Sequence, residues 1–526
     1  MISVMKRTIR LFTIIPVVLL LSVFAYGQRA SNPVIFADVP DMAIIRVGNV
    51  YYMSSTTMHM SPGVPIMRSE DLINWKMVSY AYDKLDDTDE LNLANGKSTY
   101  GRGSWASSLR YHKGTYYVST FSGTTNKTYI YTTKNIEKGP WKAHSFAPAL
   151  HDHSLFFDDD GRAYMIYGAG RIMLTELNED LSGIKADTQP RSIIENASAP
   201  AGAEIGLPSE GSQLFKVNGK YYLFNITWPR GGMRTVVIHR ADRITGPYEG
   251  RVGLHDKGVA QGGLISTPKG QWYAYLFRDF GAVGRIPYLV PVSWQDGWPV
   301  LGAGAKVPEE LDLPPSRGYI PGIVASDEFS RSRNERDLPL AWQWNHNPDN
   351  TLWSLKQRPG FLRLTTGRTD TSFLLARNTL TQRTFGPQCT GITALDVSGM
   401  KEGDCAGLAL LQAKYGWVGV KAEEGGRCSL VMINADSGKP LEAGRVPLHQ
   451  KVVYLRADCD FKDRTDKARF YYSLDGKSWT AIGDTLKMAY TLPHFMGYRF
   501  GLFSYATKEA GGYADFDYFR ISDGQK

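Results

Sequence analysis

One pattern of apolar and polar positions recurs five times within the first three hundred residues. Each copy has an apolar pair, a short polar turn with glycine and then an aromatic pair, as in SQLFKVNGKYYLF. Short alternating segments with such turns predict β-hairpins. The copies begin at Ala43, Ser107, Ser154, Ser212 and Gly262.

The spacing of the copies predicts how the hairpins are arranged. Their second aromatic residues are 65, 47, 58 and 51 residues apart, which suits one four-stranded sheet per copy. A second recurring segment, such as RSEDLINW from Arg68, suits the outer strand of each sheet and its exit loop. Helical patterns are scarce, so we predict an all-β fold with a five-bladed β-propeller over residues 32–306.

The remaining chain predicts a second domain. A proline-rich linker, expected at 307–326, is followed by repeated short strands to the end of the sequence. A chain of 526 residues is also too long for one ordinary core. We therefore predict a C-terminal β-sandwich over residues 327–526.

The N-terminus has the pattern of a secretory signal peptide. Lys6, Arg7 and Arg10 precede an apolar run that ends in a small-x-small cleavage pattern at Ala25–Gly27. We expect cleavage of residues 1–27, no membrane span, and export to the periplasm or beyond it as a secreted protein. Removing those three basic residues lowers the net charge from +8 to +5, too small and too scattered a surplus to predict a nucleic-acid partner.

The four cysteines lie in the last third of the chain without CxxC or zinc-site spacing. An exported protein permits disulfides, but buried free thiols are equally compatible with the sequence. The cysteines are Cys389, Cys405, Cys428 and Cys459.

Polar groups precede the first strand of each repeat. In a propeller these strands line the central channel, so the residues just before them converge on one axis. A single acid there is usually a turn residue, but three at one register favour a pocket. Three or four positions upstream of the apolar residues Ile44, Leu109, Leu155, Leu214 and Leu264 lie, in the same order, Asp41, Trp105, Asp152, Glu210 and Gln261.

Three convergent carboxyl groups suit glycoside hydrolysis. Like charges and burial separate their pKa values, so that one group can be an acid while another is a base. Trp105 offers an apolar platform for a sugar ring, and Arg285 offers several hydrogen-bond donors. Core packing for Trp105 and an ordinary salt bridge for Arg285 are the alternatives.

A metal site is the competing interpretation of the segment HDHSLFFDDDG. The run DDDG resembles a hairpin turn more than a calcium loop. On a strand, His151 and His153 would face away from Asp152, so we expect solvated or packing histidines rather than ligands.

Five segments together resemble glycoside hydrolase family 43. They are NPVIFADVPDMAIIRVGNVYYM, GSWASSL, HDHSLFFDDDGRAYM, SEGSQLFKVNGKYYL and GRIPYL. The resemblance implies that Asp41 is the general base and Glu210 the general acid, while Asp152 orients the acid and tunes its pKa. It also implies that Trp105 stacks on the sugar and Arg285 contacts it.

The segments depart from the family pattern at Ala43, His153 and Ser212. Gln261 stands where many members have a histidine that binds a central cation, so we count it with the substrate-binding residues and predict no metal and no cofactor. The glutamine variant and the C-terminal region resemble a subgroup of exo-acting α-L-arabinofuranosidases and β-xylosidases that carry a concanavalin-like sandwich.

This resemblance implies an exo-acting, inverting hydrolase that acts on oligosaccharides or polysaccharides. The first expectation is release of terminal α-L-arabinofuranose from arabinoxylan or xyloglucan, and a β-D-xylosidase or a non-catalytic sugar-binding propeller are the alternatives. Inversion predicts that the carboxyl groups of Asp41 and Glu210 lie roughly 6.5 to 9.5 Å apart. We also expect Met58, His59 and Met60 to shape the pocket mouth or to form an exposed loop.

Overall fold

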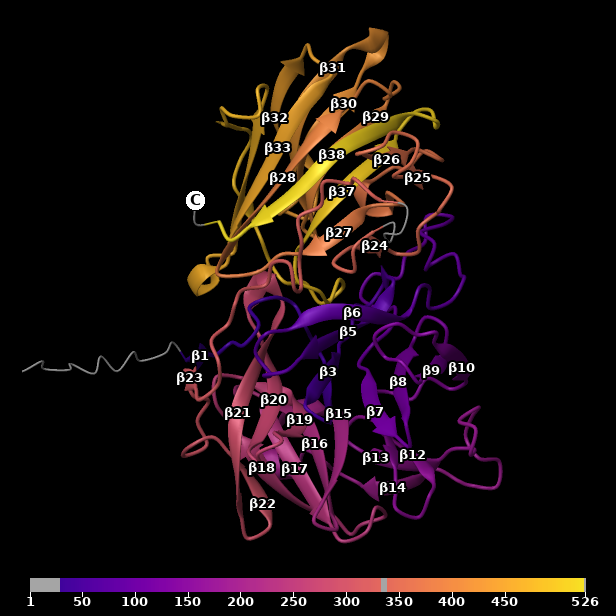
Figure 1. The fold of residues 1–526 in the computed structure, drawn as a ribbon, viewed down its shortest axis with the longest axis vertical. Coiled ribbons are helices and arrows are strands. Elements are labelled where there is room, and N and C mark those ends of the chain that lie inside the picture. The colour runs from indigo at the N-terminus through magenta and orange to yellow at the C-terminus, as the bar shows by residue number, and fades with distance from the viewer. Residues whose placement is uncertain (1–28, 333–337, 525–526) are drawn as a thin grey trace, which may run out of the picture.

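The computed structural model describes residues 29–332 and 338–524, and the predicted signal peptide therefore lies outside the described residues. Figure 1 shows two β-rich bodies stacked along the long axis, with the N-terminal body below and the C-terminal body above. Helix is confined in this part of the chain to five three-residue 3-10 turns: η1 (Ala199–Ala201), η2 (Gly281–Val283), η3 (Phe373–Leu375), η4 (Glu424–Gly426) and η5 (Lys462–Arg464). The described residues contain no helix with the length and apolar character needed to cross a membrane.

The lower body is the predicted five-bladed β-propeller. It contains five antiparallel sheets of four strands, and each sheet takes its strands in chain order. The blades are β2 (Ala43–Val47), β3 (Val50–Ser54), β5 (Gly63–Ser69) and β6 (Lys76–Tyr82); β7 (Ser108–His112), β8 (Thr115–Ser122), β9 (Lys127–Thr133) and β10 (Lys142–Phe146); β11 (Ser154–Phe157), β12 (Ala163–Tyr167), β13 (Ile172–Glu176) and β14 (Arg191–Ile194); β15 (Ile205–Val217), β16 (Lys220–Pro229), β17 (Thr235–Ala241) and β18 (Glu249–Leu254); and β19 (Ala260–Ser266), β20 (Trp272–Asp279), β21 (Arg285–Gln295) and β22 (Trp298–Leu301).

The repeat pattern explains this arrangement. The five hairpins predicted from the sequence are the first two strands of the five blades, and their glycine turns include Gly48, Gly114 and Gly219 with positive φ. The first strands contact one another in a closed ring, from β2 through β7, β11, β15 and β19 back to β2. Residues that precede these strands therefore meet at one end of a common channel.

The ring is closed without exchange of strands between the first and last blades. Instead, β1 (Ala30–Ser31) pairs with β23 (Glu310–Leu311), which follows the last blade. Asn32 strengthens this closure, because its side-chain amide donates to the carbonyls of Leu289 and Pro308 and its side-chain oxygen accepts from the backbone N–H of Leu289. The two ends of the propeller are thus held side by side.

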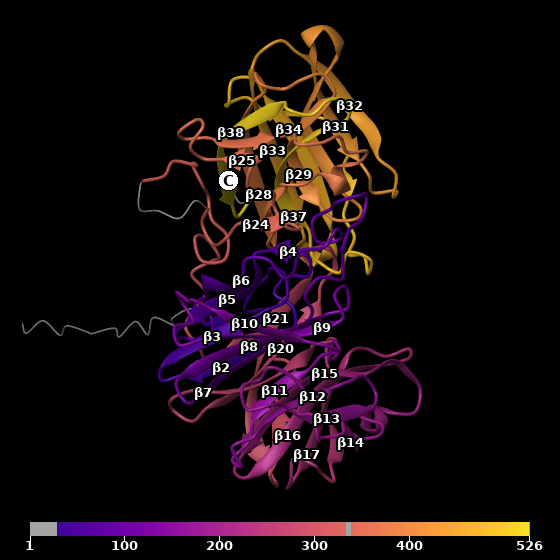
Figure 2. The ribbon, with the colours of Figure 1, turned by 90° about the vertical axis from the view of Figure 1, so that its right-hand side faces the viewer.

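The upper body is the predicted β-sandwich, with two antiparallel sheets (Figures 1 and 2). One sheet runs in the order β32 (Leu441–Leu448), β31 (Cys428–Asn434), β30 (Gly416–Ala422), β29 (Asp404–Leu411), β37 (Arg499–Ala506), β27 (Leu380–Arg383), β24 (Gln343–Asn345) and β4 (Met60–Ser61). The other runs in the order β25 (Trp353–Ser354), β26 (Leu362–Thr365), β38 (Tyr513–Ser522), β28 (Gln388–Asp396), β33 (Val452–Asp460), β34 (Lys467–Ser473) and β35 (Thr480–Ala481), with β36 (Leu486–Lys487) also pairing with β34.

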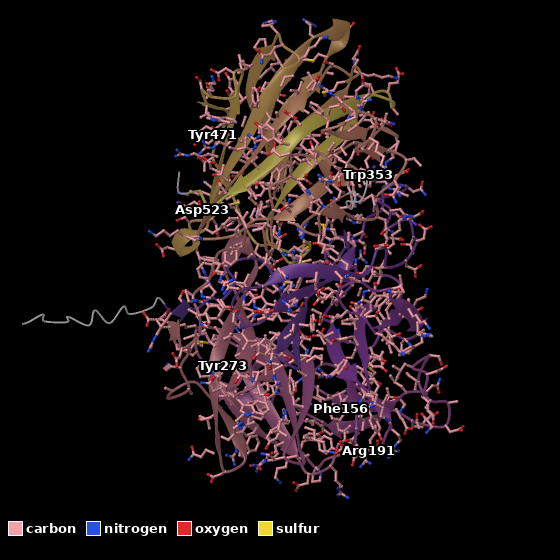
Figure 3. All side chains as sticks on the ribbon, viewed as in Figure 1. Phe156, Arg191, Tyr273, Trp353, Tyr471 and Asp523 are labelled. Carbon is pink, nitrogen blue, oxygen red and sulfur yellow. The ribbon has the colours of Figure 1, made fainter. Side chains whose placement is uncertain are left out.

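The two bodies share a sheet. Strand β4 belongs to the first blade's chain segment but pairs with β24 of the sandwich, at the junction between the bodies in Figure 2. Side chains fill both bodies in Figure 3, where Tyr273 marks the propeller and Trp353 the sandwich. The expectation for Met58, His59 and Met60 is wrong, because the sandwich covers this loop: His59 is only 1% exposed, and the loop lies in the interface rather than at a pocket mouth.

Three buried histidines, His59, His346 and His494, form a cluster at this junction, here called the interface histidines. Their rings pack on one another and on Tyr100, with the ring centroids of His59 and His346 4.7 Å apart. Burial lowers the pKa of each, for His494 to about 3, so the cluster is uncharged at neutral pH.

The cysteines are free thiols in the structure. Cys389 on β28 and Cys459 on β33 are direct cross-strand neighbours, and both are buried. The remaining two, Cys405 and Cys428, lie on β29 and β31.

Candidate active site

All six site residues predicted from the sequence line one pocket of about 750 Å³ at the end of the propeller channel. That volume is typical of small-molecule sites. The six are Asp41, Trp105, Asp152, Glu210, Gln261 and Arg285.

In several blades a left-handed backbone conformation places the pocket residue. Asp41, Asp152 and Gln261 have φ values of 49°, 46° and 50°, in the left-handed region that residues other than glycine rarely adopt. In the fourth blade the positive φ falls on Gly211, directly after Glu210. Such strain is retained where it positions functional groups.

Asp41 is a buried carboxylate held by an arginine. It is 5% exposed, and Nη1 of Arg285 donates to both of its oxygens at 2.9 and 3.0 Å. Burial raises the pKa of Asp41; Asp38 and Glu210 add to this rise, whereas Arg285 and Arg234 oppose it. The ion pair therefore favours the ionised form of a carboxyl group that burial alone would neutralise.

Arg285 was predicted to contact substrate hydroxyl groups. The structure places it in the pocket wall, but it is buried and its guanidinium group is directed at Asp41. The backbone N–H of Arg285 donates to Oδ1 of Asp38, which fixes the start of β21. The salt bridge that sequence reasoning kept as an alternative is thus present, and direct contact with a sugar stays a prediction.

Glu210 lies at a break in the regular pairing of β15 with β16. The register shifts on both sides of the pair formed by Glu210 and Ile226, which is typical of bulges beside active sites. Asn225 holds this irregular segment, because its side-chain amide donates to the carbonyl of Glu210 and to Oγ of Ser212. The bulge turns the carboxyl group of Glu210 into the pocket.

Asp152 and Glu210 are joined through the backbone and through a histidine. The N–H of Gly211 donates to Oδ2 of Asp152 at 3.1 Å. Nε2 of His151 lies 2.9 Å from Oε2 of Glu210 and 3.9 Å from Oδ2 of Asp152. The expectation that His151 faces away from Asp152 is wrong, because the two residues lie in a turn before β11, where strand alternation does not apply.

His153 behaves as expected and packs in the interior. It is buried, its Nε2 lies 2.8 Å from Oγ of Ser119, and its Nδ1 lies 2.9 Å from the carbonyl of Leu150. Burial lowers its pKa to about 4.

Burial and neighbouring charges shift the pKa values of Asp152 and His151. Burial raises the pKa of Asp152 to about 7, with His151 opposing the rise and Glu210 and Asp41 adding to it. For His151, burial lowers the pKa, but the hydrogen bond to Glu210 and the charge of Asp152 outweigh it and raise the pKa to about 9. The pocket therefore contains carboxyl groups in different environments, as acid and base catalysis requires.

Comparison with known proteins identifies the family. The sequence model of glycosyl hydrolases family 43 matches residues 30–299, and that of the beta xylosidase C-terminal concanavalin A-like domain matches residues 326–522. The chain belongs to family 43 of the glycosyl hydrolases. This confirms the resemblance on which the site assignments depend.

Individual family 43 proteins are similar over most of the chain. The solved structure of a bifunctional GH43-CE protein from Bacteroides eggerthii is 67% identical and covers 95% of this chain with a TM-score of 0.94, and this chain spans 64% of that protein's length. A beta-xylosidase of Formosa agariphila is 31% identical over 94% of this chain and 90% of its own length. A non-reducing end alpha-L-arabinofuranosidase of Bacteroides ovatus is 28% identical over 68% of this chain and 69% of its own.

The sandwich contributes two side chains to the wall of the pocket. Leu492 and Phe495, from the loop before β37, line the pocket beside Trp105. The rings of Phe495 and Trp105 meet edge to face with centroids 4.9 Å apart, and the guanidinium carbon of Arg285 lies 5.4 Å from the centroid of the Phe495 ring. No local sequence pattern points to Phe495, because its position results from the docking of the sandwich.

Sequence reasoning also missed two residues of the fourth blade's segment that line the pocket. Trp228 at the end of β16 is 42% exposed, and Arg234 lies beside it with its guanidinium carbon 5.4 Å from the centroid of the indole ring. Nε of Arg234 forms an ion pair with Oδ2 of Asp279 at 2.7 Å. An exposed indole at the pocket mouth offers a surface on which a sugar ring can stack.

One group in the described part of the chain has donor atoms spaced closely enough for a metal ion. Donor atoms of His151, Asp152 and Glu210 lie within 4.8 Å of one another. Nε2 of His151 already hydrogen bonds with Glu210, and these are the carboxyl groups that the family pattern assigns to acid catalysis. Proton transfer therefore stays the prediction for this group, and the absence of a required metal stays an expectation.

Proposed function

We propose that this family 43 protein is an exo-acting, inverting glycosidase that removes terminal α-L-arabinofuranose from side chains of xylan-type hemicellulose. The observation that carries the proposal is the convergence of Asp41, Asp152 and Glu210 on one pocket with an aromatic wall. Three carboxyl groups in one pocket that is large enough for a sugar meet the requirements of acid–base hydrolysis of a glycosidic bond.

The reaction assigns one step to each carboxyl group. Glu210, protonated, donates its proton to the glycosidic oxygen, and the bond from the anomeric carbon to that oxygen breaks. Asp41, ionised by its pairing with Arg285, takes a proton from a water molecule whose oxygen bonds to the opposite face of the same carbon. Asp152 fixes the loop after Glu210 through the N–H of Gly211. The products are an inverted sugar and a free alcohol.

The shape of the pocket supports action at chain ends. The sandwich residues Leu492 and Phe495 and the blade residue Trp105 line it together, so that its wall combines both bodies. A terminal sugar fits such a pocket, whereas an internal sugar of a polymer needs an open groove. Trp228, exposed at the mouth, is placed to stack on the sugar that is released as the leaving group.

The second candidate is a β-D-xylosidase that acts on xylo-oligosaccharides. It is favoured by the similarity to a protein named beta-xylosidase over 94% of this chain. α-L-Arabinofuranose and β-D-xylose present similar shapes and hydroxyl layouts to such a pocket. A sugar-binding propeller without turnover is the third candidate.

A panel of nitrophenyl pentosides, followed by arabinosylated xylo-oligosaccharides, separates these candidates. We expect the highest kcat/KM on the α-L-arabinofuranoside, with losses of at least about 100-fold in Glu210→Gln on oligosaccharides and in Asp41→Asn on all substrates. Proton NMR of the fresh product should show the inverted anomer. Faster cleavage of the β-D-xyloside would establish the second candidate, and binding without turnover would establish the third.

We also propose that the protein acts outside the cytoplasm. The basic and apolar pattern of residues 1–27 supports export. Fractionation of cells that produce the full chain, with N-terminal sequencing of the product, tests this, and we expect a mature N-terminus near Gln28.

A further inference from the structure

His151 is a titratable side chain of the pocket that the reaction described above does not use. Its side chain is 47% exposed, whereas that of Glu210 is 22% exposed. The imidazole lies between solvent and the acid, with Nε2 at 2.9 Å from Oε2 of Glu210. On its other side the ring packs edge to face on Phe121, with centroids 5.3 Å apart, which limits its rotation.

The reaction leaves the carboxyl group of Glu210 without its proton. Each turnover transfers one proton from Glu210 to the leaving oxygen, while Asp41 gains one from water. Before the next turnover Glu210 must regain a proton, and a neighbouring group that carries protons at neutral pH can deliver it. Asp152 and His151 both have this chemistry. Of the two, His151 hydrogen bonds with the carboxyl group of Glu210 and is also exposed to solvent.

We propose that His151 is a positioning residue for the general acid: its Nε2 holds the carboxyl group of Glu210 toward the leaving oxygen and passes it a proton from solvent in each turnover. This inference rests on the proposed function, because it assumes that Glu210 is the acid.

The protons taken up and released by His151, Glu210 and Asp41 balance over one turnover. After bond cleavage Glu210 is a carboxylate and His151 is a neutral imidazole, which takes a proton from solvent. When the next sugar binds, the imidazolium N–H at Nε2 gives this proton to Oε2 of Glu210, and a neutral carboxyl group and a neutral imidazole result. Asp41 returns its proton to solvent, so that one water molecule and one glycoside yield two hydroxyl products with no net change in protons.

In the pocket without bound sugar, the surroundings of His151 favour the protonated imidazole. The titratable groups that act on it are Asp152 in its own turn, Glu210 on β15 and His153, and the residue packed on it from β8 is the uncharged Phe121. The two acids raise the pKa of His151 to about 9. When a sugar excludes water from the pocket, a neutral pair costs less than an ion pair, which drives the proton to Glu210.

The kinetic test compares His151→Gln and His151→Ala with the wild type on two leaving groups. On an arabinosylated oligosaccharide, which needs protonation, we expect kcat/KM to fall about 100-fold, the low end of what general acid catalysis contributes. On the nitrophenyl arabinofuranoside, whose leaving group needs little protonation, we expect a change of less than about threefold. His144→Gln, an exposed histidine on β10, is the matched control and should behave as the wild type.

Two further readouts exclude a merely structural role. The basic limb of kcat/KM on the oligosaccharide should move to lower pH in His151→Gln, because the imidazole that holds a proton up to about pH 9 is then missing. Added imidazole should restore oligosaccharide cleavage to His151→Ala but not to Glu210→Gln. Equal losses on both substrates, with an unshifted basic limb, would overturn the inference.

An NMR titration tests the pairing of His151 with Glu210 without any turnover of substrate. The imidazole signals of His151, assigned by their loss in His151→Gln, should titrate near pH 9 in the wild type and at least one unit lower in Glu210→Gln. Identical titrations in the two proteins would overturn the inference even in an active enzyme. Failure of the wild type to cleave any pentoside would instead refute the proposed function, whatever the titration shows.

Discussion

The buried ion pair between Asp41 and Arg285 allows a sharp prediction about the pH dependence of the enzyme. Both side chains are 4% exposed, and one guanidinium nitrogen contacts both carboxylate oxygens. The proposed base must be ionised to accept a proton, yet burial raises its pKa. Replacing Arg285 with glutamine removes the compensating charge and leaves the burial in place.

The expected size of the effect follows from the contact distance. An opposite charge within 4 to 6 Å lowers a carboxyl pKa by about 1–3 units, so its removal should raise the pKa of Asp41 by about the same amount. Below its pKa the ionised fraction of Asp41 falls about tenfold per pH unit, which corresponds to about 1.4 kcal/mol. The acid limb of kcat/KM should therefore move up by about 1–3 pH units in Arg285→Gln.

The assay is kcat/KM from pH 4 to 9 on the nitrophenyl substrate, for which protonation of the leaving group matters little. Arg285→Lys is the matched control: it retains the charge on a differently shaped side chain, so we expect a smaller shift. Breaking a buried pair costs about 3–5 kcal/mol, so thermal unfolding must show that the variant is folded at the assay temperature. An acid limb at the wild-type pH in a folded Arg285→Gln protein would refute the assignment of Asp41 as a base tuned by Arg285.

Two other predictions concern the sandwich and its junction with the propeller. In Phe495→Ala we expect KM to rise about tenfold with a smaller change in kcat, since an aromatic pair with Trp105 contributes about 0.5–1.5 kcal/mol. A KM equal to that of the wild type would show that the sandwich does not shape the pocket. The interface histidines have folded-state pKa values below their unfolded value of 6.5, so the unfolded state binds more protons as the pH falls below 6.5 and stability decreases. Urea unfolding should show a loss of up to about 1.4 kcal/mol per pH unit for each histidine, and a reduced slope in His494→Asn, whereas constant stability between pH 6.5 and 5 would contradict this reasoning.

Much of the propeller and the three carboxyl groups of the pocket could be predicted because both follow from a repeat. Apolar and aromatic alternation around a glycine turn defines each hairpin, and five copies define five blades. Because a repeat places equivalent residues at equivalent points in space, Asp41, Asp152 and Glu210 could be expected in one pocket before any coordinates were known. Their surroundings could not be predicted in the same way.

The residues that sequence reasoning missed or misjudged are those placed by the tertiary structure. His151 was expected to alternate away from Asp152, but both residues lie in a turn, and their donor atoms lie within 4.8 Å of each other and of a carboxylate oxygen of Glu210. Phe495 reaches the pocket only because the sandwich docks on the propeller, with β4 of the first blade's segment pairing with β24.

The sequence by itself determined the fold class, the blade count and the three carboxyl groups, because strand periodicity and turn chemistry are local properties that repeat along the chain. Only the tertiary structure decided the partners of those groups: the arginine on Asp41, the histidine on Glu210 and the aromatic wall from the second domain. Protonation states depend on burial and on charges a few ångströms away, and contacts between residues hundreds of positions apart leave no local pattern in the sequence.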